Sequence, residues 1–147
     1  MPHYPISIGA QALTELADWL AVQSFSQLLV LDDAHTHLHC YPQLQPQLPA
    51  HQVFTVPAGE QHKHLSTCVA IWQAMTELAL DRRALVLNLG GGVIGDMGGF
   101  VAATYKRGLD FVQVPTTLLA MVDASVGGKL GIDFQGYKNH VGLYREP

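Results

Sequence analysis

The chain has 147 residues, of which 48% are hydrophobic and 14% charged, and its formal net charge is −4. These values predict one globular domain with a hydrophobic core, and the acidic balance argues against a nucleic-acid surface. No apolar run reaches membrane length, and the N-terminus lacks the features of a signal peptide. We therefore expect a cytoplasmic protein in which the isolated Cys40 and Cys68 are free thiols.

The first part of the chain carries a pattern of strand, helix and strand. Residues His3 to Ile8 alternate weakly and predict an edge strand, and leucines at helical spacing predict an amphipathic helix over 10–22. The apolar run Leu28 to Leu31 predicts a buried strand that ends in Asp32. An acid at the carboxyl end of a strand is where α/β folds place ligand contacts. Asp32 is thus a candidate ribose ligand, and a helix N-cap or a solvated loop acid is an equal alternative.

A histidine-rich segment follows that strand. His35, His37 and His39 alternate next to Cys40, which is a composition found in metal sites. The alternate spacing places the three imidazoles on one side only if the segment is extended. Three prolines follow within ten residues, so we expect an irregular surface connection without a metal site.

A second strand and its loop come next. The run Gln52 to Val56 predicts a strand, and Gly59, Glu60 and Lys63 follow it in a glycine loop. The two charged side chains are candidates for binding ribose or adenine, or else they form an exposed pair at the start of a helix. Apolar residues three or four apart then predict a packing helix over 65–79.

The centre of the sequence reads as a βαβ unit. A strand over 85–89 leads through glycines 90–92 into a helix over 93–106, and a further strand covers 111–114. Glycines before a helix N-terminus let an anion such as a diphosphate approach the backbone. The alternative is a glycine turn that only packs helix on sheet. No acid ends the strand over 111–114, so a ribose contact would have to come from another strand, such as Asp32.

Charged residues also flank this unit. Asp96, in the first turn of the predicted helix, either complements the helix dipole or holds a cofactor, and Arg107 complements the dipole at the other end. After Pro115, an apolar stretch is interrupted by Lys129 and Lys138. These two lysines are candidates for binding phosphate or carboxylate, although surface lysines are usually only solvated.

Four runs together resemble the 3-dehydroquinate synthase family. They are PAGEQHK (57–63), LGGGVIGDMGGFVAATYKRG (89–108), FVQVPTTLLAMVDASVGGK (111–129) and KNHVG (138–142). The resemblance covers nearly the whole chain from residue 57. It departs from the family pattern at Ala34, Gly98, Leu130-Gly131 and Tyr137.

The resemblance implies a Rossmann-like α/β domain with a parallel sheet that binds NAD and spans residues 1–147. It implies further that this chain is the N-terminal part of an enzyme whose second, helical domain holds the zinc or cobalt ligands, so that no metal ligand is expected here. Substrate-facing positions implied by the family are Asp123, Asn139 and Arg107, the last reaching the neighbouring subunit of a homodimer. Cofactor positions are Asp32, Gly59, Glu60, Lys63, Gly91, Gly92, Val93, Ile94, Gly95, Asp96, Thr116, Thr117, Leu119, Lys129 and Lys138.

The family reaction is the conversion of a phosphorylated seven-carbon keto acid, DAHP, to 3-dehydroquinate and inorganic phosphate in the shikimate pathway. The resemblance implies this activity for the parent enzyme and inactivity for the chain alone. Two alternatives remain open at this point. One is a related sugar-phosphate cyclase such as 2-deoxy-scyllo-inosose synthase, and the other is a nucleotide-binding module without chemistry of its own.

Overall fold

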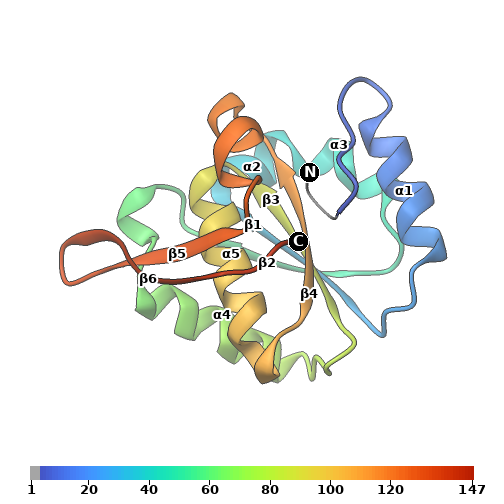
Figure 1. Cartoon of the computed structure of the whole chain (residues 1–147). Helices are drawn as coiled ribbons and strands as arrows, with labels where there is room; N and C mark the ends of the chain where they lie inside the picture. The colour runs from blue at the N-terminus through green and yellow to red at the C-terminus, as the bar shows by residue number, and fades with distance from the viewer. Residues whose placement is uncertain (1–3) are drawn as a thin grey trace.

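Four parallel strands form the centre of the molecule, as the computed structural model of residues 4–147 shows (Figure 1). They are β1 (Leu28–Asp33), β2 (Gln52–Val56), β3 (Leu85–Gly90) and β4 (Asp110–Pro115), in the spatial order β2-β1-β3-β4. All neighbouring pairs run parallel, with Leu29 opposite Gln52 and Leu85 opposite Asp110. The predicted parallel α/β domain of Rossmann-like type is confirmed.

Helices cover both faces of this sheet. The helices α4 (Leu65–Glu77) and α5 (Gly92–Thr104) share one buried cluster with alternate strand residues such as Leu31 and Val86. The intervening residues, such as Val30, pack on the other face against α1 (Ala12–Val22) and the segment that follows β1. Successive side chains of β1 point to opposite faces of the sheet, and both faces are covered. Every side chain of β1 is therefore buried except that of Asp33, which is half-buried, and this explains why the strand reads as a continuous apolar run.

The histidine-rich segment is helical, so the predicted irregular connection is wrong. It forms α2 (Ala34–His39), α3 (Tyr41–Leu44) and the 3-10 turn η1 (Gln45–Gln47). Asp33 and Thr36 form a capping box that starts α2, with the Asp33 carboxylate accepting from two backbone N–H groups. Pro42 and Pro46 lie in the first turns of α3 and η1, where a missing N–H costs nothing.

The N-terminal segment is not the predicted edge strand. Residues 5–8 are exposed and pair with no strand, and His3 lies outside the described residues. The hydroxyl of Tyr4 instead donates to the Ser125 carbonyl at 3.5 Å and accepts from Gly127 N at 3.4 Å. The weak alternation of this segment does not produce a strand, because no neighbouring strand is available to pair with it.

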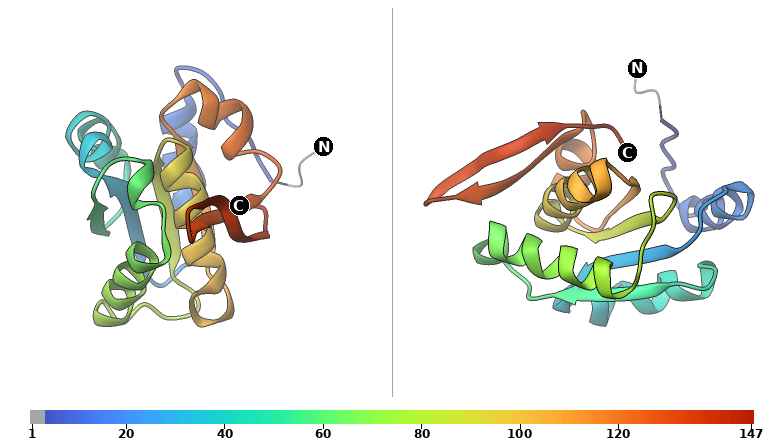
Figure 2. Two further views of the ribbon diagram at one scale, coloured as in Figure 1. Left: turned by 90° about the vertical axis from the view of Figure 1, so that its left-hand side faces the viewer. Right: turned by 90° about the horizontal axis from the view of Figure 1, so that it is seen from below.

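The C-terminal quarter forms a π-helical turn, η4 (Ala120–Ala124), and a hairpin of β5 (Lys129–Phe134) and β6 (Tyr137–Tyr144). Gln135 and Gly136, with φ of 50° and 83°, make the two-residue turn that this hairpin requires. Both views in Figure 2 place α5 between the hairpin and the sheet, and Leu130 and Ile132 extend the buried cluster there. Within residues 4–147, no helix is both long and apolar enough to cross a membrane.

Candidate functional site

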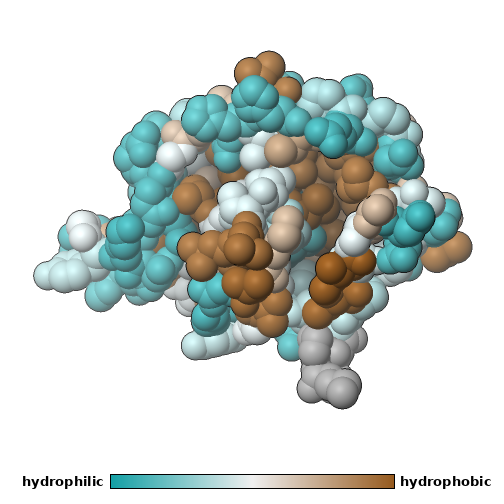
Figure 3. Space-filling view, turned by 90° about the horizontal axis from the view of Figure 1, so that it is seen from above, coloured by the Kyte–Doolittle hydropathy of each residue, from teal (hydrophilic) through white to brown (hydrophobic). Residues whose placement is uncertain are grey.

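The predicted cofactor residues gather along one edge of the sheet. They lie at or after the carboxyl ends of all four parallel strands: Asp32 is the penultimate residue of β1, the Gly59–Lys63 loop follows β2, Gly91 follows β3 and Thr116 follows β4. Carboxyl ends of parallel strands meet at the same edge, where α/β folds place their ligands. Figure 3 looks down on the molecule and shows a recessed, partly hydrophobic area, with hydrophilic surface above it and hydrophobic patches below it.

The glycine turn between β3 and α5 is closely packed. A Cβ on Gly90 would lie 2.5 Å from Ile94 Cβ, and one on Gly91 would lie 3.3 Å from Thr117 Cγ2. Thr116 N donates to Gly90 O at 3.0 Å, which joins the loops after β3 and β4. The bare backbone therefore brings the N-terminus of α5 to the open edge, where its free N–H groups favour an anion.

Asp32 is fully buried, with an exposed fraction of 0%. Its Oδ2 lies 2.8 Å from His37 Nδ1, whereas Oδ1 has no hydrogen-bond partner among the described residues. Burial raises the pKa of the Asp32 carboxyl, against the lowering effect of Thr55 and His37. Of the two alternatives for this acid, the helix N-cap belongs to Asp33 and a solvated position is excluded by burial.

Lys63 joins the cofactor residues to the hairpin. Its ammonium group, only 4% exposed, donates to Asp96 Oδ2 at 2.7 Å and to Asn139 Oδ1 at 2.6 Å. Burial raises the pKa of the Asp96 carboxyl, and the hydrogen bond and charge of Lys63 oppose that shift. Asp133 Oδ1 accepts from Asn139 N, and Asp133 N donates to the Lys63 carbonyl, so the hairpin is held on both sides of this contact.

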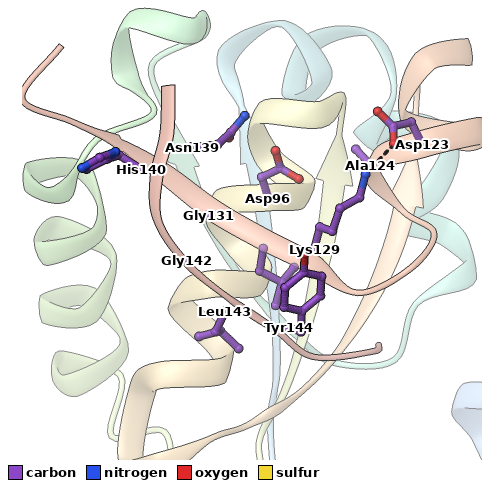
Figure 4. Close-up of a pocket in the computed structure, with 11 residues that line it drawn as sticks. Asp96, Asp123, Ala124, Lys129, Gly131, Asn139, His140, Gly142, Leu143 and Tyr144 are labelled. Atoms are coloured by element: carbon purple, nitrogen blue, oxygen red, sulfur yellow. Dashed lines mark hydrogen bonds and ion pairs between the residues drawn. The ribbon is translucent and has the colours of Figure 1, made fainter. Parts of the chain in front are cut away.

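A cavity of about 430 Å³ opens between α5, η4 and the hairpin (Figure 4). In this view the Asp96 carboxylate lies between Asn139 on one side and the ion pair of Lys129 and Asp123 on the other. The pair is exposed, with 3.0 Å between Lys129 Nζ and Asp123 Oδ1, and Asp123 raises the pKa of Lys129 by hydrogen bond and charge. The cavity is lined by Asp96, Asp123, Ala124, Lys129, Leu130, Gly131, Asn139, His140, Gly142, Leu143 and Tyr144.

The remaining predicted residues lie around this edge with one exception. Glu60 and Lys138 form an exposed ion pair at 3.3 Å, and Leu119 is 70% exposed after β4. Ile94 belongs to the buried core, which leaves only its main chain for a ligand. Arg107 lies at the opposite end of α5 with φ of 75°, outside the residues that line the cavity.

Several residues of this region were not predicted as site residues. His140 and Tyr144 line the cavity from β6, and His37 contacts Asp32. The Gln135-Gly136 pair is the sequence signal for the hairpin turn, although it is a weaker turn signal than Asn-Gly. The turn pairs Phe134 with Tyr137, and a register shift between Ile132 and Phe134 then sets Tyr144 opposite Lys129.

A metal does not fit the described part of the chain. Within residues 4–147, no three His, Cys, Asp or Glu side chains come close enough together to hold an ion. In α2, His35 and His39 are four residues apart and share one face, whereas His37 lies about 200° around the helix and contacts Asp32, so the three imidazoles do not converge. No chemical step is therefore assigned to a metal on these residues.

Comparison with known proteins places these features in a family. Residues 53–147 match the family described as 3-dehydroquinate synthase N-terminal. A 3-dehydroquinate synthase of Parabacteroides distasonis is 42% identical over 150 residues, covering 100% of this chain and 42% of that protein. The chain thus spans about two fifths of the length of this curated relative.

Two solved structures share the fold. ValA, a 2-epi-5-epi-valiolone synthase from Streptomyces hygroscopicus subsp. jinggangensis with NAD⁺ and Zn²⁺ bound, superposes with a TM-score of 0.86 at 30% identity. It covers 99% of this chain, which covers 41% of ValA. A 2-deoxy-scyllo-inosose synthase complexed with carbaglucose-6-phosphate, NAD⁺ and Co²⁺ gives a TM-score of 0.81 at 27% identity, covering 92% and 38%. With 95 consecutive residues matched, 53 to 147, the chain belongs to the 3-dehydroquinate synthase N-terminal family.

Proposed function

We propose that this chain is the NAD-binding part of a 3-dehydroquinate synthase, which converts DAHP to 3-dehydroquinate and phosphate. The observation that carries the proposal is the meeting of Asp32, the Gly90–Gly92 turn and Lys63 at one edge of a parallel sheet. An acid for ribose and a bare helix N-terminus for a diphosphate are the two groups that a dinucleotide needs. The solved structure of ValA, 30% identical, holds NAD⁺.

The residues of the chain fit this cofactor. The Asp32 Oδ1 atom is buried without a hydrogen-bond donor, which a ribose hydroxyl would supply. The turn before α5 carries no Cβ that would keep a diphosphate from the backbone N–H groups. Gly59, Glu60, Thr116, Thr117 and Leu119 flank the same edge from the loops after β2 and β4. When bound, NAD⁺ supplies reversible hydride transfer to the reaction.

The cavity next to this edge is our proposed substrate side. Lys129, paired with Asp123, presents a cation to a phosphate or carboxylate, and Asn139 is held in place by Lys63. Asp96 lines the cavity from α5 and therefore lies between the proposed cofactor and substrate positions. Lys138, paired with Glu60, adds a second cation at the rim.

Further parts of the proposal concern the whole enzyme. Arg107, exposed at the far end of α5, is proposed to reach the substrate of a second subunit in a homodimer. The metal ligands are proposed to come from outside these 147 residues, so that the chain alone forms no dehydroquinate. The free Cys40 and Cys68 support a reducing, cytoplasmic location.

Calorimetric titration with NAD⁺ tests the cofactor part, with Gly92→Ala as the diagnostic variant. A Cβ at Gly92 lies 3.6 Å from Ala124, an ordinary contact, so the melting temperature should stay unchanged. The same Cβ keeps a diphosphate from the helix N-terminus, and affinity should fall about tenfold or more, that is by at least about 1.4 kcal/mol. If NAD⁺ at millimolar concentration binds neither the chain nor its His37→Ala variant, in which the ring beside Asp32 is removed, the proposal is wrong.

The substrate part is tested on the full-length enzyme with DAHP and with glucose 6-phosphate. Identity of 42% to a 3-dehydroquinate synthase, against 27% to a 2-deoxy-scyllo-inosose synthase, favours turnover of DAHP. Turnover of glucose 6-phosphate alone would instead assign the second activity. Calorimetric binding of NAD⁺ without turnover of either substrate by the full-length enzyme would leave only a nucleotide-binding module.

A further inference from the structure

The histidine-rich helix α2 places one imidazole on the proposed ribose ligand. His37 Nδ1 lies 2.8 Å from Asp32 Oδ2, and the side chain of Asp32 is 0% exposed whereas that of His37 is 45% exposed. His37 therefore lies on the solvent side of the carboxylate. Because Asp32 has no exposed surface, a ligand from solvent reaches it only if a covering side chain such as His37 moves.

The neighbours of His37 hold the ring in that position. Thr55 Oγ1, which the sheet register places beside Asp32, lies 3.3 Å from the same Nδ1 atom. The Tyr41 ring stacks on the imidazole with 4.9 Å between centroids and 12° between planes. The Tyr41 hydroxyl in turn lies 2.8 Å from His51 Nε2, while His51 Nδ1 contacts the Pro49 carbonyl at 2.6 Å. The His37 side chain is nevertheless 45% exposed, so one side of the ring faces solvent.

From this geometry we infer that His37 and the adenosine ribose of NAD⁺ compete for the Asp32 carboxylate, so that His37 sets the affinity of the site for ribose diols. The inference rests on the proposed NAD⁺ site. Binding replaces one hydrogen bond, from imidazole to carboxylate, with hydrogen bonds from the ribose hydroxyls. The buried Oδ1 atom gains a donor only when the diol enters, which provides the driving force for the exchange.

His37→Ala is the diagnostic variant, because it removes the competing donor and exposes Asp32. We expect NAD⁺ to bind about three- to tenfold more tightly, since a hydrogen bond to a charged group no longer has to be broken. His39→Ala is the matched control: it removes an exposed imidazole from the same helix, and within residues 4–147 the His39 side chain makes no hydrogen bond. The control should bind NAD⁺ like the unmodified chain.

A double-mutant cycle separates competition from a structural effect of losing the ring. In the Asp32→Ala background there is no carboxylate to compete for, so His37→Ala should leave NAD⁺ affinity unchanged. An equal gain in both backgrounds would show that the ring acts by bulk, and it would overturn the inference.

The outcomes also distinguish this inference from the proposed function. If the unmodified chain binds NAD⁺ tightly and His37→Ala binds it no more tightly, or more weakly, the inference is overturned and the proposed NAD⁺ site is retained. Binding only in His37→Ala supports both and shows that the ring closes the site. No binding in either protein contradicts both proposals. A second probe, ADP against 2′,3′-dideoxy-ADP, should show the gain only for the ligand that carries the diol.

Discussion

Lys63 and Asp96 form a largely buried ion pair between the loop after β2 and the first turns of α5. The distance from Lys63 Nζ to Asp96 Oδ2 is 2.7 Å, and the two side chains are 4% and 20% exposed. Because the ammonium group also donates to Asn139, one lysine connects the proposed cofactor edge to the hairpin that lines the substrate cavity.

The first prediction is that Lys63→Met destabilises the chain by about 3 kcal/mol, the lower end for removing one partner of a buried pair. The carboxylate of Asp96 and the amide of Asn139 would both lose their donor. Urea unfolding measures the change. The matched control is Lys138→Met, whose pair with Glu60 is exposed, and there the loss should stay within about 0.5 kcal/mol. Equal effects of the two substitutions would contradict this account of Lys63.

The second prediction concerns pH and Asp32. Its pKa in the folded chain is raised above the ordinary value of 3.8, mainly by burial. The native state therefore holds the proton at pH values where the unfolded chain has released it, and stability falls as pH rises from 3.8 through the folded pKa. Asp32→Asn cannot ionise, so it should gain stability relative to the unmodified chain over that window and keep a constant advantage above it.

Urea unfolding of both proteins at several pH values between about 4 and 8 tests whether the stability of the unmodified chain falls relative to Asp32→Asn as pH rises, because the same unfolding transition is compared in each protein. Asp110→Asn, which removes an exposed carboxylate, is the control for the loss of one acidic side chain. A constant difference between Asp32→Asn and the unmodified chain at every pH would refute the raised pKa.

The sequence predicted the sheet chiefly because its two central strands, β1 and β3, are buried on both faces and read as largely apolar runs. It predicted the edge of the sheet where Asp32, Gly91 and Lys63 meet, since carboxyl ends of parallel strands share one edge. It did not predict that Lys63 is buried, because a loop lysine is ordinarily exposed and its two partners lie 33 and 76 residues away in sequence.

The errors have local physical causes. Residues 34–47 were expected to be irregular on account of their prolines, but proline is compatible with the first turn of a helix and Asp33 supplies the cap. The role of His37 depends on that helix, because only the turn of α2 returns its ring to Asp32. The hairpin was missed because β6 is mostly exposed and lacks a regular alternation of buried residues.

The third prediction concerns the thiols. Burial raises the pKa of Cys68 to about 12, and its exposed fraction is 0%. Iodoacetamide at pH 8 should therefore alkylate only Cys40 in the native chain, and more slowly than a free thiol because burial raises the pKa of Cys40 as well. Peptide mass analysis locates the label, and unfolding in urea should make both residues react. Native labelling of Cys68 would show that α4 opens readily.

The fourth prediction tests the packing of α5 on the sheet. A Cβ at Gly98 would lie 2.1 Å from Asn88 Oδ1 and 2.8 Å from Leu31 Cδ2, so the close approach of helix and strand depends on this glycine. Asn88 is 1% exposed, and neither of its side-chain polar atoms has a partner within residues 4–147. Gly98→Ala should cost about 1–3 kcal/mol through overpacking.

The stability lost in Gly98→Ala should depend on Asn88, because the Asn88 side chain occupies the space that the new methyl group needs. In the double variant N88A/G98A the clash with Oδ1 is gone and the unpartnered amide is removed from the core, so much of the lost stability should return. Thermal and urea unfolding of the two single variants and the double variant give the coupling between the sites. Additive effects would mean that Leu31, the other close neighbour, and not Asn88, limits the approach of α5 to β3.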